Sequence, residues 1–429
     1  MQNNMQTAKT PGNRLSSDFW KYWAGQTISN LGSSVTLFAL PLLVYKLTGS
    51  AINLGISGAA NFLPYLLFGL ILGAWTDRVN RKRMMIFTDI ARAVIVATIP
   101  LLVVLGPLPI WWIYVVGFIH STLTICFEAG QFAAIPSLVK QDDLVTANGR
   151  IQASYSAAQI AGPLLAGLLV IRVPLASLML IDAMSFLVSS ISIALVRINF
   201  NAKKGEQKTS IRSDVVEGLR YVLSHPVLRN ISIMMALVNF VSTASYAQIV
   251  LFAKVRLSAS DVQVSLLFSA ASLGVVIMGL LAGPLRKRWS FSTVALGALM
   301  LEGLLGVVFS LMRWYWIAAF IWMLAGGLGI LFNINTGSLR QAIVPNHMLG
   351  RVISIASVLA WSAIPLGSLL GGFAITWTHN VALVFTITGI LTFLIPFSFS
   401  FTALGHADRY IPQKEEKKSE EAALVPRES

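Results

Sequence analysis

Six ionisable side chains lie inside long apolar runs of this 429-residue sequence: Asp89, Arg92, His120, Glu128, Asp182 and Glu302. A charged group inside a bilayer is costly, so such residues mark functional sites by default. A carboxyl group in apolar surroundings holds its proton more tightly than in water. It can therefore take up a proton at one face of a membrane and release it at the other. Glu128, His120, Glu302 and Asp182 are our candidates for proton coupling.

Spacing predicts how some of these residues are placed. Asp89 and Arg92 are three residues apart, so they share a helix face and are predicted to form a structural ion pair. His120 and Glu128 are eight residues apart, about 80° around a helix, so both are expected to face one lumen. A competing interpretation has Glu128 anchor Arg81 and its basic neighbours, and His120 act as a packing residue.

The sequence lacks the residue patterns that other kinds of chemistry need. The apolar runs contain no convergent Ser/His/Asp set, zinc-type Cys/His spacing or Gly-rich phosphate loop. Cys126 is the single cysteine, which excludes an internal disulfide. We therefore expect no enzyme, no metal, no cofactor and no nucleic-acid partner. The expected partners are a small-molecule substrate, protons and the lipid bilayer, with the chain acting as a monomer on the energy of the proton gradient.

Composition indicates a membrane protein. Hydrophobic residues make up 55% of the chain, charged residues only 12%, and the mean hydropathy is +0.72. Soluble domains carry about 25% charged residues. Half that content means that most of the chain never meets water.

Twelve apolar runs have the length of roughly 20 residues that a helix needs to cross a bilayer. They lie near 20–46, 51–76, 84–106, 109–135, 150–171, 174–196, 227–253, 262–284, 290–312, 314–339, 350–377 and 380–404. The Pro-containing segments 106–109 and 172–174 read as turns that keep neighbouring runs apart.

Lys and Arg residues give these runs an orientation. With the N-terminus inside, 26 of the 32 fall in cytoplasmic segments and five on the other side. This is a strong positive-inside bias. We expect a multi-pass protein of a bacterial cell (inner) membrane with both termini cytoplasmic.

One long polar segment divides the chain into six runs plus six. The predicted parts are a cytoplasmic N-terminal segment (1–19), an N-terminal six-helix bundle (20–197), a basic cytoplasmic linker (198–226), a C-terminal six-helix bundle (227–404) and a cytoplasmic tail (405–429). Within the linker, 214–223 is predicted to form a short amphipathic helix on the inner leaflet. The tail ends in a stretch, 424–427, that resembles a thrombin-site scar or is natural, and we assign it no function.

The two halves echo each other at an offset near 200 residues. Gly73 to Arg83 follows the second run, and Gly279 to Arg288 ends the eighth. Such repeats are typical of transporters whose halves rock about a central site. The fold class is therefore an all-α polytopic membrane protein with twelve transmembrane helices in two pseudo-symmetric six-helix bundles.

At these residues the chain resembles the major facilitator superfamily, and more narrowly its drug:proton antiporter branch of macrolide-efflux proteins and enterobactin-type siderophore exporters. The similarity covers 18–404. Its most specific part is the signature formed by Gly73, Asp77, Arg78, Arg81 and Lys82. Asn80 replaces the usual glycine, and asparagine also tolerates a left-handed turn.

The resemblance implies roles for these residues. Asp77 is expected to pack against the start of the eleventh helix, and the basic residues to pair with nearby acids, forming a cytoplasmic gate. The alternative is that the cluster only fixes topology. Gly162, Pro163 and Gly167 partly match the fifth-helix signature of antiporters, although close helix packing explains them equally well.

The resemblance also places Asp182 and Glu302 in peripheral helices, where Asp182 is expected to support packing. Polar and aromatic residues on the first, second, seventh and tenth runs are candidates for the substrate cavity: Gln26, Asn30, Tyr65, Asn239, Tyr246, Asn333 and Asn335. An amphiphilic drug needs a mostly apolar pocket with a few hydrogen-bonding groups.

The expected function is proton-coupled export of amphiphilic small molecules of macrolide or multidrug type by alternating access. A dedicated siderophore or lipid exporter is the alternative within the superfamily. A membrane sensor or scaffold that transports nothing is the alternative of a different class.

Overall fold

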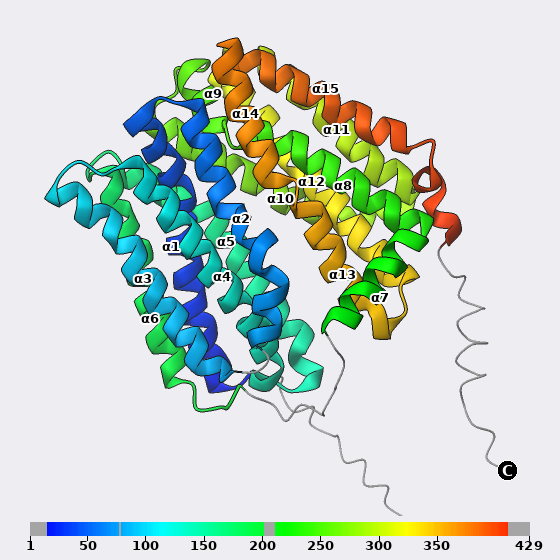
Figure 1. Cartoon of the computed structure of the whole chain (residues 1–429), viewed down its shortest axis with the longest axis horizontal. Helices are drawn as coiled ribbons and strands as arrows, with labels where there is room; N and C mark the ends of the chain where they lie inside the picture. The colour runs from blue at the N-terminus through cyan, green and yellow to red at the C-terminus, as the bar shows by residue number, and fades with distance from the viewer. Residues whose placement is uncertain (1–14, 77–78, 201–210, 411–429) are drawn as a thin grey trace, which may run out of the picture.

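The computed structural model describes residues 15–76, 79–200 and 211–410, and all regular structure in these ranges is helical (Figure 1). Eleven helical segments of the described chain are long and apolar enough to cross a bilayer. A twelfth helix of similar length, α5 (Leu144–Leu169), is less apolar because its first half carries polar residues such as Arg150 and Gln152. The predicted all-α, twelve-span fold is confirmed.

Helices α1 to α6 form the first half of the molecule. Their bounds are α1 Ser17–Thr48, α2 Ala51–Thr76, α3 Arg81–Leu105, α4 Ile110–Leu138, α5 Leu144–Leu169 and α6 Met179–Leu195, with short 3₁₀ turns η1 (Gln141–Asp143) and η2 (Leu175–Leu178).

Helices α7 to α15 form the second half. Their bounds are α7 Ile211–Ser224, α8 Pro226–Tyr246, α9 Ile249–Val255, α10 Asp261–Arg288, α11 Phe291–Leu311, α12 Tyr315–Ile343, α13 Asn346–Trp361, α14 Ile364–Thr378 and α15 Val381–Phe399, followed by η3 (Ala403–Tyr410).

Local sequence fixes several helix ends. The Ser16 side chain accepts a hydrogen bond from the Phe19 amide (3.0 Å) and so caps α1, which ends at Gly49 with φ 60°. Asn80 caps α3 by accepting from the Arg83 amide (3.0 Å). Its φ is −70°, so the left-handed turn that we considered for Asn80 is wrong: its side chain is used for capping instead.

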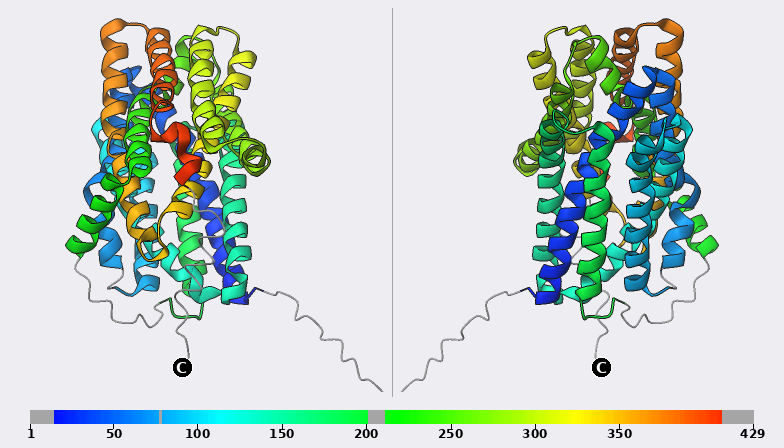
Figure 2. Two further views of the ribbon diagram at one scale, coloured as in Figure 1. Left: turned by 90° about the vertical axis from the view of Figure 1, so that its right-hand side faces the viewer. Right: turned by 90° about the vertical axis from the view of Figure 1, so that its left-hand side faces the viewer.

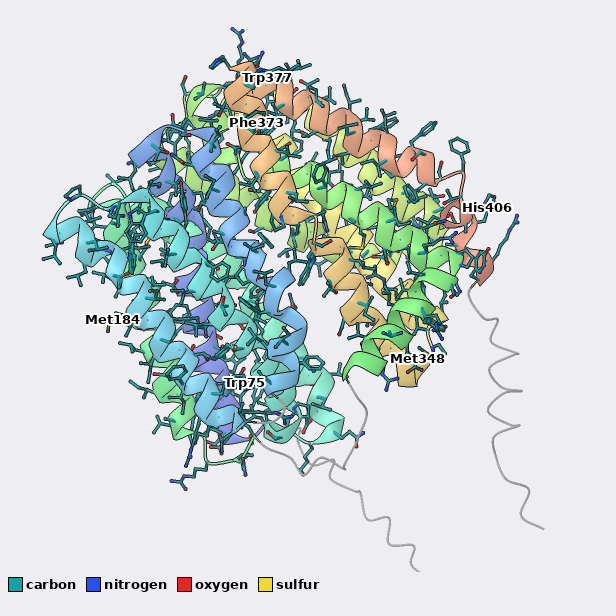
Figure 3. The ribbon with its side chains drawn as sticks, viewed as in Figure 1. Trp75, Met184, Met348, Phe373, Trp377 and His406 are labelled. Atoms are coloured by element: carbon teal, nitrogen blue, oxygen red, sulfur yellow. The ribbon has the colours of Figure 1, made fainter. Side chains whose placement is uncertain are left out.

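The two halves meet at one face of the molecule and diverge toward the other (Figures 1 and 2). We call the face on which α1 begins and α10 ends the basic face, because Arg81, Lys82 and the 286–288 cluster lie there. The face on which α1 ends and α2 begins is the opposite face. Figure 3 shows Trp75 on α2 and Met348 on α13 at the two sides of the opening at the basic face.

Contacts that join the halves lie toward the opposite face. Ser368 of α14 donates a hydrogen bond to the Gly55 carbonyl of α2 (2.9 Å), and Ser269 of α10 donates to the Ile160 carbonyl of α5 (3.0 Å). Phe38 of α1 packs edge-on against Phe268 of α10 (6.0 Å between centroids). The opening at the basic face therefore ends at a closed floor.

Two membrane segments of the second half are broken, which the sequence did not predict. The seventh segment comprises α8 and α9, with the break at Ala247 and Gln248. The eleventh comprises α13 and α14, with the break at Ser362 and Ala363. Pro365 in the first turn of α14 suits a helix start there.

The linker helix α7 does not lie alone on a membrane surface. Leu219 and Val222 of α7 join a hydrophobic cluster with Val352 and Ile355 of α13, and Glu217 pairs with Arg351 (2.7 Å). Part of the apolar face of α7 is thus covered by α13, whereas Val216 and Leu223 stay exposed. The placement of α7 on the inner leaflet stays a prediction.

Residues 405–410, which we assigned to the polar tail, are also packed. Leu404 and Ala407 of η3 are fully buried, and Asp408 pairs with Arg286 and accepts a hydrogen bond from the Phe291 amide (2.8 Å). The tail was predicted to start too early because η3 is short and mostly polar.

Small residues allow the helices of the second half to approach closely. A Cβ placed on Gly303 of α11 would lie 2.7 Å from the Gly389 carbonyl oxygen of α15, whereas one on Gly297 of the same helix would meet nothing within 4 Å. We expect Gly303→Ala to lower the free energy of unfolding in mixed micelles by about 1–3 kcal/mol, because α15 must move away.

The matched control is Gly297→Ala, which should be neutral or slightly stabilising because alanine favours helix. Equal stability of the two variants would mean that α11 and α15 are not packed this closely.

Candidate functional site

A pocket of about 180 Å³ lies between the two halves, where the opening meets its floor. Its walls come from α2 and α4 of the first half and α13 of the second. The lining residues are Tyr65, Leu66, Gly69, Ile125, Ser354, Ser357, Val358, Trp361 and Ser362. Aromatic and aliphatic walls with a few hydroxyls fit an amphiphilic ligand.

Glu128 of α4 lies beside this pocket and is exposed. The Tyr65 hydroxyl donates a hydrogen bond to its carboxylate (3.3 Å). The Tyr65 ring meets Trp361 of α13 edge-on, with 5.7 Å between centroids. Tyr65 therefore connects the acid of the first half to the aromatic wall of the second. Among the described residues, the partner of Glu128 is Tyr65, and Arg81 donates to the Phe200 carbonyl.

Two further tyrosines, one on α5 and one on α8, are partly exposed. Tyr155 of α5 is 46% exposed, and its hydroxyl accepts a hydrogen bond from Gln159 (2.9 Å). Tyr246 of α8 is 50% exposed and stacks on Trp322 of α12 (6.0 Å).

Arg92 and Asp89 form a buried ion pair in the first half. The Arg92 guanidinium lies between the rings of Phe127 and Phe186, 4.4 Å from each centroid. Asp89 also accepts a hydrogen bond from Ser189 (2.6 Å). The structure thus brings Asp89 and Arg92 together away from the opening.

His120 and Glu128 face different surroundings, so the expectation of a shared lumen is wrong. His120 packs against Phe186 of α6 (5.7 Å between ring centroids), and its Nε2 atom is buried without a partner. An angle of about 80° around α4 is enough to place one residue inside the bundle and the other at the opening.

Asp182 and Glu302 also lie away from the central pocket. Asp182 of α6 is fully buried and accepts a hydrogen bond from Ser33 of α1 (3.1 Å). Glu302 of α11 faces α12 beside Gly329, and its Oε2 atom is buried without a partner.

The predicted gate is described in part. Gly73 lies within α2, whereas Asp77 and Arg78 lie outside the described residues. Arg81 donates to the Phe200 carbonyl (3.1 Å), and Lys82 donates to the carbonyls of Ala194 (3.0 Å) and Val196 (2.5 Å). These two cations therefore hold the end of α6 at the basic face.

The fifth-helix residues lie at two helix contacts. A Cβ on Gly162 would lie 3.0 Å from the Ser34 backbone of α1, and one on Gly167 would collide with Ser265 of α10. Pro163 lies inside α5 and is buried. Gly167 thus lies at a contact between the halves.

The cavity candidates are scattered. Tyr65 lines the central pocket, whereas Tyr246 stacks on Trp322 of α12. Gln26 is buried and donates to Ser189 (2.7 Å), and Asn335 donates to the Leu331 carbonyl of its own helix (2.7 Å). Neither Gln26 nor Asn335 lines the central pocket.

The other three candidates lie elsewhere. Asn239 of α8 donates to the Ala360 carbonyl of α13 (2.9 Å). Asn30 is half-buried on α1, and Asn333 is exposed on α12.

Sequence reasoning missed the α13 wall and an ion cluster at the opposite face. Ser354, Ser357 and Trp361 recur at helical spacing, a polar stripe that would have suggested a pocket-facing side. Asp261 of α10 pairs with Lys254 of α9 (2.6 Å) and, across the halves, with Lys46 of α1.

Within the described ranges, no His/Cys/Asp/Glu group is placed to hold a metal ion.

Comparison with known proteins agrees with this architecture. A family model described as transmembrane secretion effector matches residues 14–427. Macrolide efflux protein A of Streptococcus pyogenes is 29% identical over 269 residues, which span 62% of this chain and 66% of that protein. The multidrug efflux pump Tap of Mycolicibacterium fortuitum is 26% identical over 351 residues, 80% of this chain and 85% of the pump.

Solved structures share the fold at low sequence identity. A mutant of the nucleoside transporter NupG has a TM-score of 0.76 at 11% identity, covering 89% of this chain and 98% of its own. A bacterial homolog of the lysosomal transporter Spinster, in an inward-facing conformation, has a TM-score of 0.72 at 13% identity, covering 92% and 98%.

We expect Arg92→Leu to lower the free energy of unfolding in mixed micelles by about 3–5 kcal/mol, because Asp89 is left buried without its cation. Adding Asp89→Asn should restore part of the loss. The control is Arg83→Leu, an exposed residue of the same helix. A loss no larger than that of the control would show that the buried pair does not stabilise the first half.

Proposed function

This chain belongs to the transmembrane secretion effector family of major facilitator transporters, and we propose that it is a proton-coupled exporter of amphiphilic small molecules that works by alternating access. Family membership supports a membrane transporter with a small-molecule substrate. The macrolide and multidrug efflux relatives support export and a substrate of that type.

The observation that carries the proposal is the hydrogen bond from Tyr65 to Glu128 at the pocket between the halves. Glu128 is the one ionisable acid among the described residues that borders both the pocket and the opening. A carboxyl group there can exchange protons with water at the basic face. It can also meet a ligand in the pocket, which antiport requires.

In the proposed cycle, ionised Glu128 accepts the Tyr65 hydrogen bond and attracts a ligand that carries a positive charge. Aromatic walls from Tyr65 and Trp361 cover its apolar part. Proton uptake by Glu128 removes the negative charge, weakens the hold on the cation and releases it. An acid at the pocket disfavours anionic ligands, which makes anionic siderophores the weaker alternative.

Alternating access needs a closure at each face. At the opposite face, the Lys46–Asp261 pair and the contacts of α14 with α2 supply it. At the basic face we assign the closure to Asp77, Arg78, Arg81 and Lys82. The basic face is taken as cytoplasmic, in a bacterial inner membrane, with a monomer as the working unit.

Glu128→Gln tests the coupling. The amide still accepts the Tyr65 hydrogen bond but cannot carry a proton. In proteoliposomes that contain the Glu128→Gln variant, we expect a pH gradient to drive export no faster than in protein-free vesicles. Tyr65→Phe should weaken substrate binding only about two- to tenfold, since it removes one hydrogen bond worth about 0.5–1.5 kcal/mol.

The control is Glu217→Gln, an exposed acid on α7 that should leave transport unchanged. Transport by Glu128→Gln at the wild-type rate with a pH gradient would assign the proton to another group.

Asp261→Asn tests the closure of the opposite face. Losing the ion pair with Lys46 should favour opening there by about 0.5–1 kcal/mol, or two- to fivefold in population. The measurement is the labelling rate of Ser368→Cys, made in a Cys126→Ala background, by a bulky maleimide that cannot cross the membrane. Ser368 is fully buried between α14 and α2.

Asp408→Asn serves as the control, because Asp408 pairs with Arg286 within the second half. If Asp261→Asn labels no faster than this control, the Lys46–Asp261 pair does not close the opposite face.

A further inference from the structure

A second pocket lies at the basic-face ends of α10 and α12, within the second half. Its volume is about 210 Å³. It is lined chiefly by Gly283, Arg286 and Lys287 of α10 and by Ile334, Asn335 and Ser338 of α12. The proposed transport cycle uses none of these residues.

The pocket is open because a glycine leaves space in it. A Cβ on Gly283 would meet nothing within 4 Å. Closer to the floor, α10 and α12 touch, and a Cβ on Gly274 would collide with the Met323 carbonyl. The two helices therefore separate toward the basic face, and the pocket fills the gap between them.

The two cations that line the pocket differ in whether they have a partner. Arg286 is already committed, because it pairs with Asp408 and donates to the Trp289 carbonyl (3.0 Å). Lys287 is exposed, and no described residue pairs with it. The pocket lining contains no acid. A free ammonium group beside a fixed guanidinium makes the site selective for an anion.

The surroundings place this pocket at the level of lipid headgroups. Leu280, one and a half turns before Arg286, is 76% exposed, and Trp289, just after the cluster, is 53% exposed. Exposed leucine followed by cations and an indole is the order found where a helix leaves the hydrocarbon core. Ile334 adds an apolar wall on α12.

We infer that this pocket binds the phosphate headgroup of an anionic phospholipid of the adjacent leaflet. Lys287 holds the phosphate, and Ile334 contacts the start of the acyl chains. Asn335 and Ser338, which donate to carbonyls of their own helix, form the α12 wall beside the headgroup. Basic pockets between membrane helices on the cytoplasmic side suit such headgroups. The site is independent of what the protein transports.

The test is binding of phosphatidylglycerol to the full chain in phosphatidylcholine nanodiscs, read by native mass spectrometry and by the thermal unfolding midpoint. Lys287→Gln removes the free charge and should lower affinity for phosphatidylglycerol about fivefold, the factor for one basic residue near a membrane surface. Gly283→Leu fills the pocket without changing any charge and should lower the affinity at least as much.

The matched control is Lys140→Gln, an equally exposed lysine before η1 in the first half, which should bind phosphatidylglycerol like the wild type. Inorganic phosphate, added to phosphatidylcholine nanodiscs, is the probe for a soluble anion.

Three results would overturn the inference. Unchanged binding in Gly283→Leu would mean that the lipid responds to diffuse surface charge. Equal losses in Lys287→Gln and Lys140→Gln would mean the same. Stabilisation of the wild type by inorganic phosphate equal to that by phosphatidylglycerol would assign the site to a soluble anion.

Discussion

The buried pair of Arg92 and Asp89 is the constraint on which the first half depends. A guanidinium in a membrane interior must find a carboxylate and aromatic faces, and Arg92 finds Asp89, Phe127 and Phe186. Because Phe127 is held against Arg92, the rotation of α4 about its axis is set. The next residue, Glu128, then points about 100° away, toward the opening. One helix rotation thus places both the contact of Phe127 with Arg92 and the acid that we propose carries the proton.

Small residues set how closely the two halves approach each other. Their close contacts use glycine and serine, which let α2 approach α14 and α5 approach α10. These glycine and serine contacts bury little side-chain volume, and the contact of Phe38 with Phe268 adds an apolar core to them. The Lys46–Asp261 pair adds an electrostatic contact at the rim. Contacts of this kind can close the opposite face and separate again, as the proposed alternating access requires.

Much of this fold could be predicted from the sequence, because hydrophobic length and charge bias are local properties. The spans and the Asp89–Arg92 pair follow from spacing along one helix. The directions of Gln26 and His120 do not, because each depends on which distant helix lies alongside. Gln26 meets Ser189 across 163 residues. The central pocket was missed for the same reason: the serine stripe of α13 is visible in the sequence, but its position opposite α2 and α4 depends on how the distant helices pack.

The break between α13 and α14 connects these observations. α14 is fixed to the first half at Gly55 through Ser368, whereas α13 carries Trp361 into the pocket and is clamped by α7. An unbroken helix would force the pocket wall and the floor contact to move as one body. The break at Ser362 and Ala363 separates the two helices, so the proposed cycle can move α13 toward α2 while α14 stays in place. Trp361 is the last residue of α13 and contacts Tyr65 of the first half. In the proposed cycle its position therefore changes when a ligand binds.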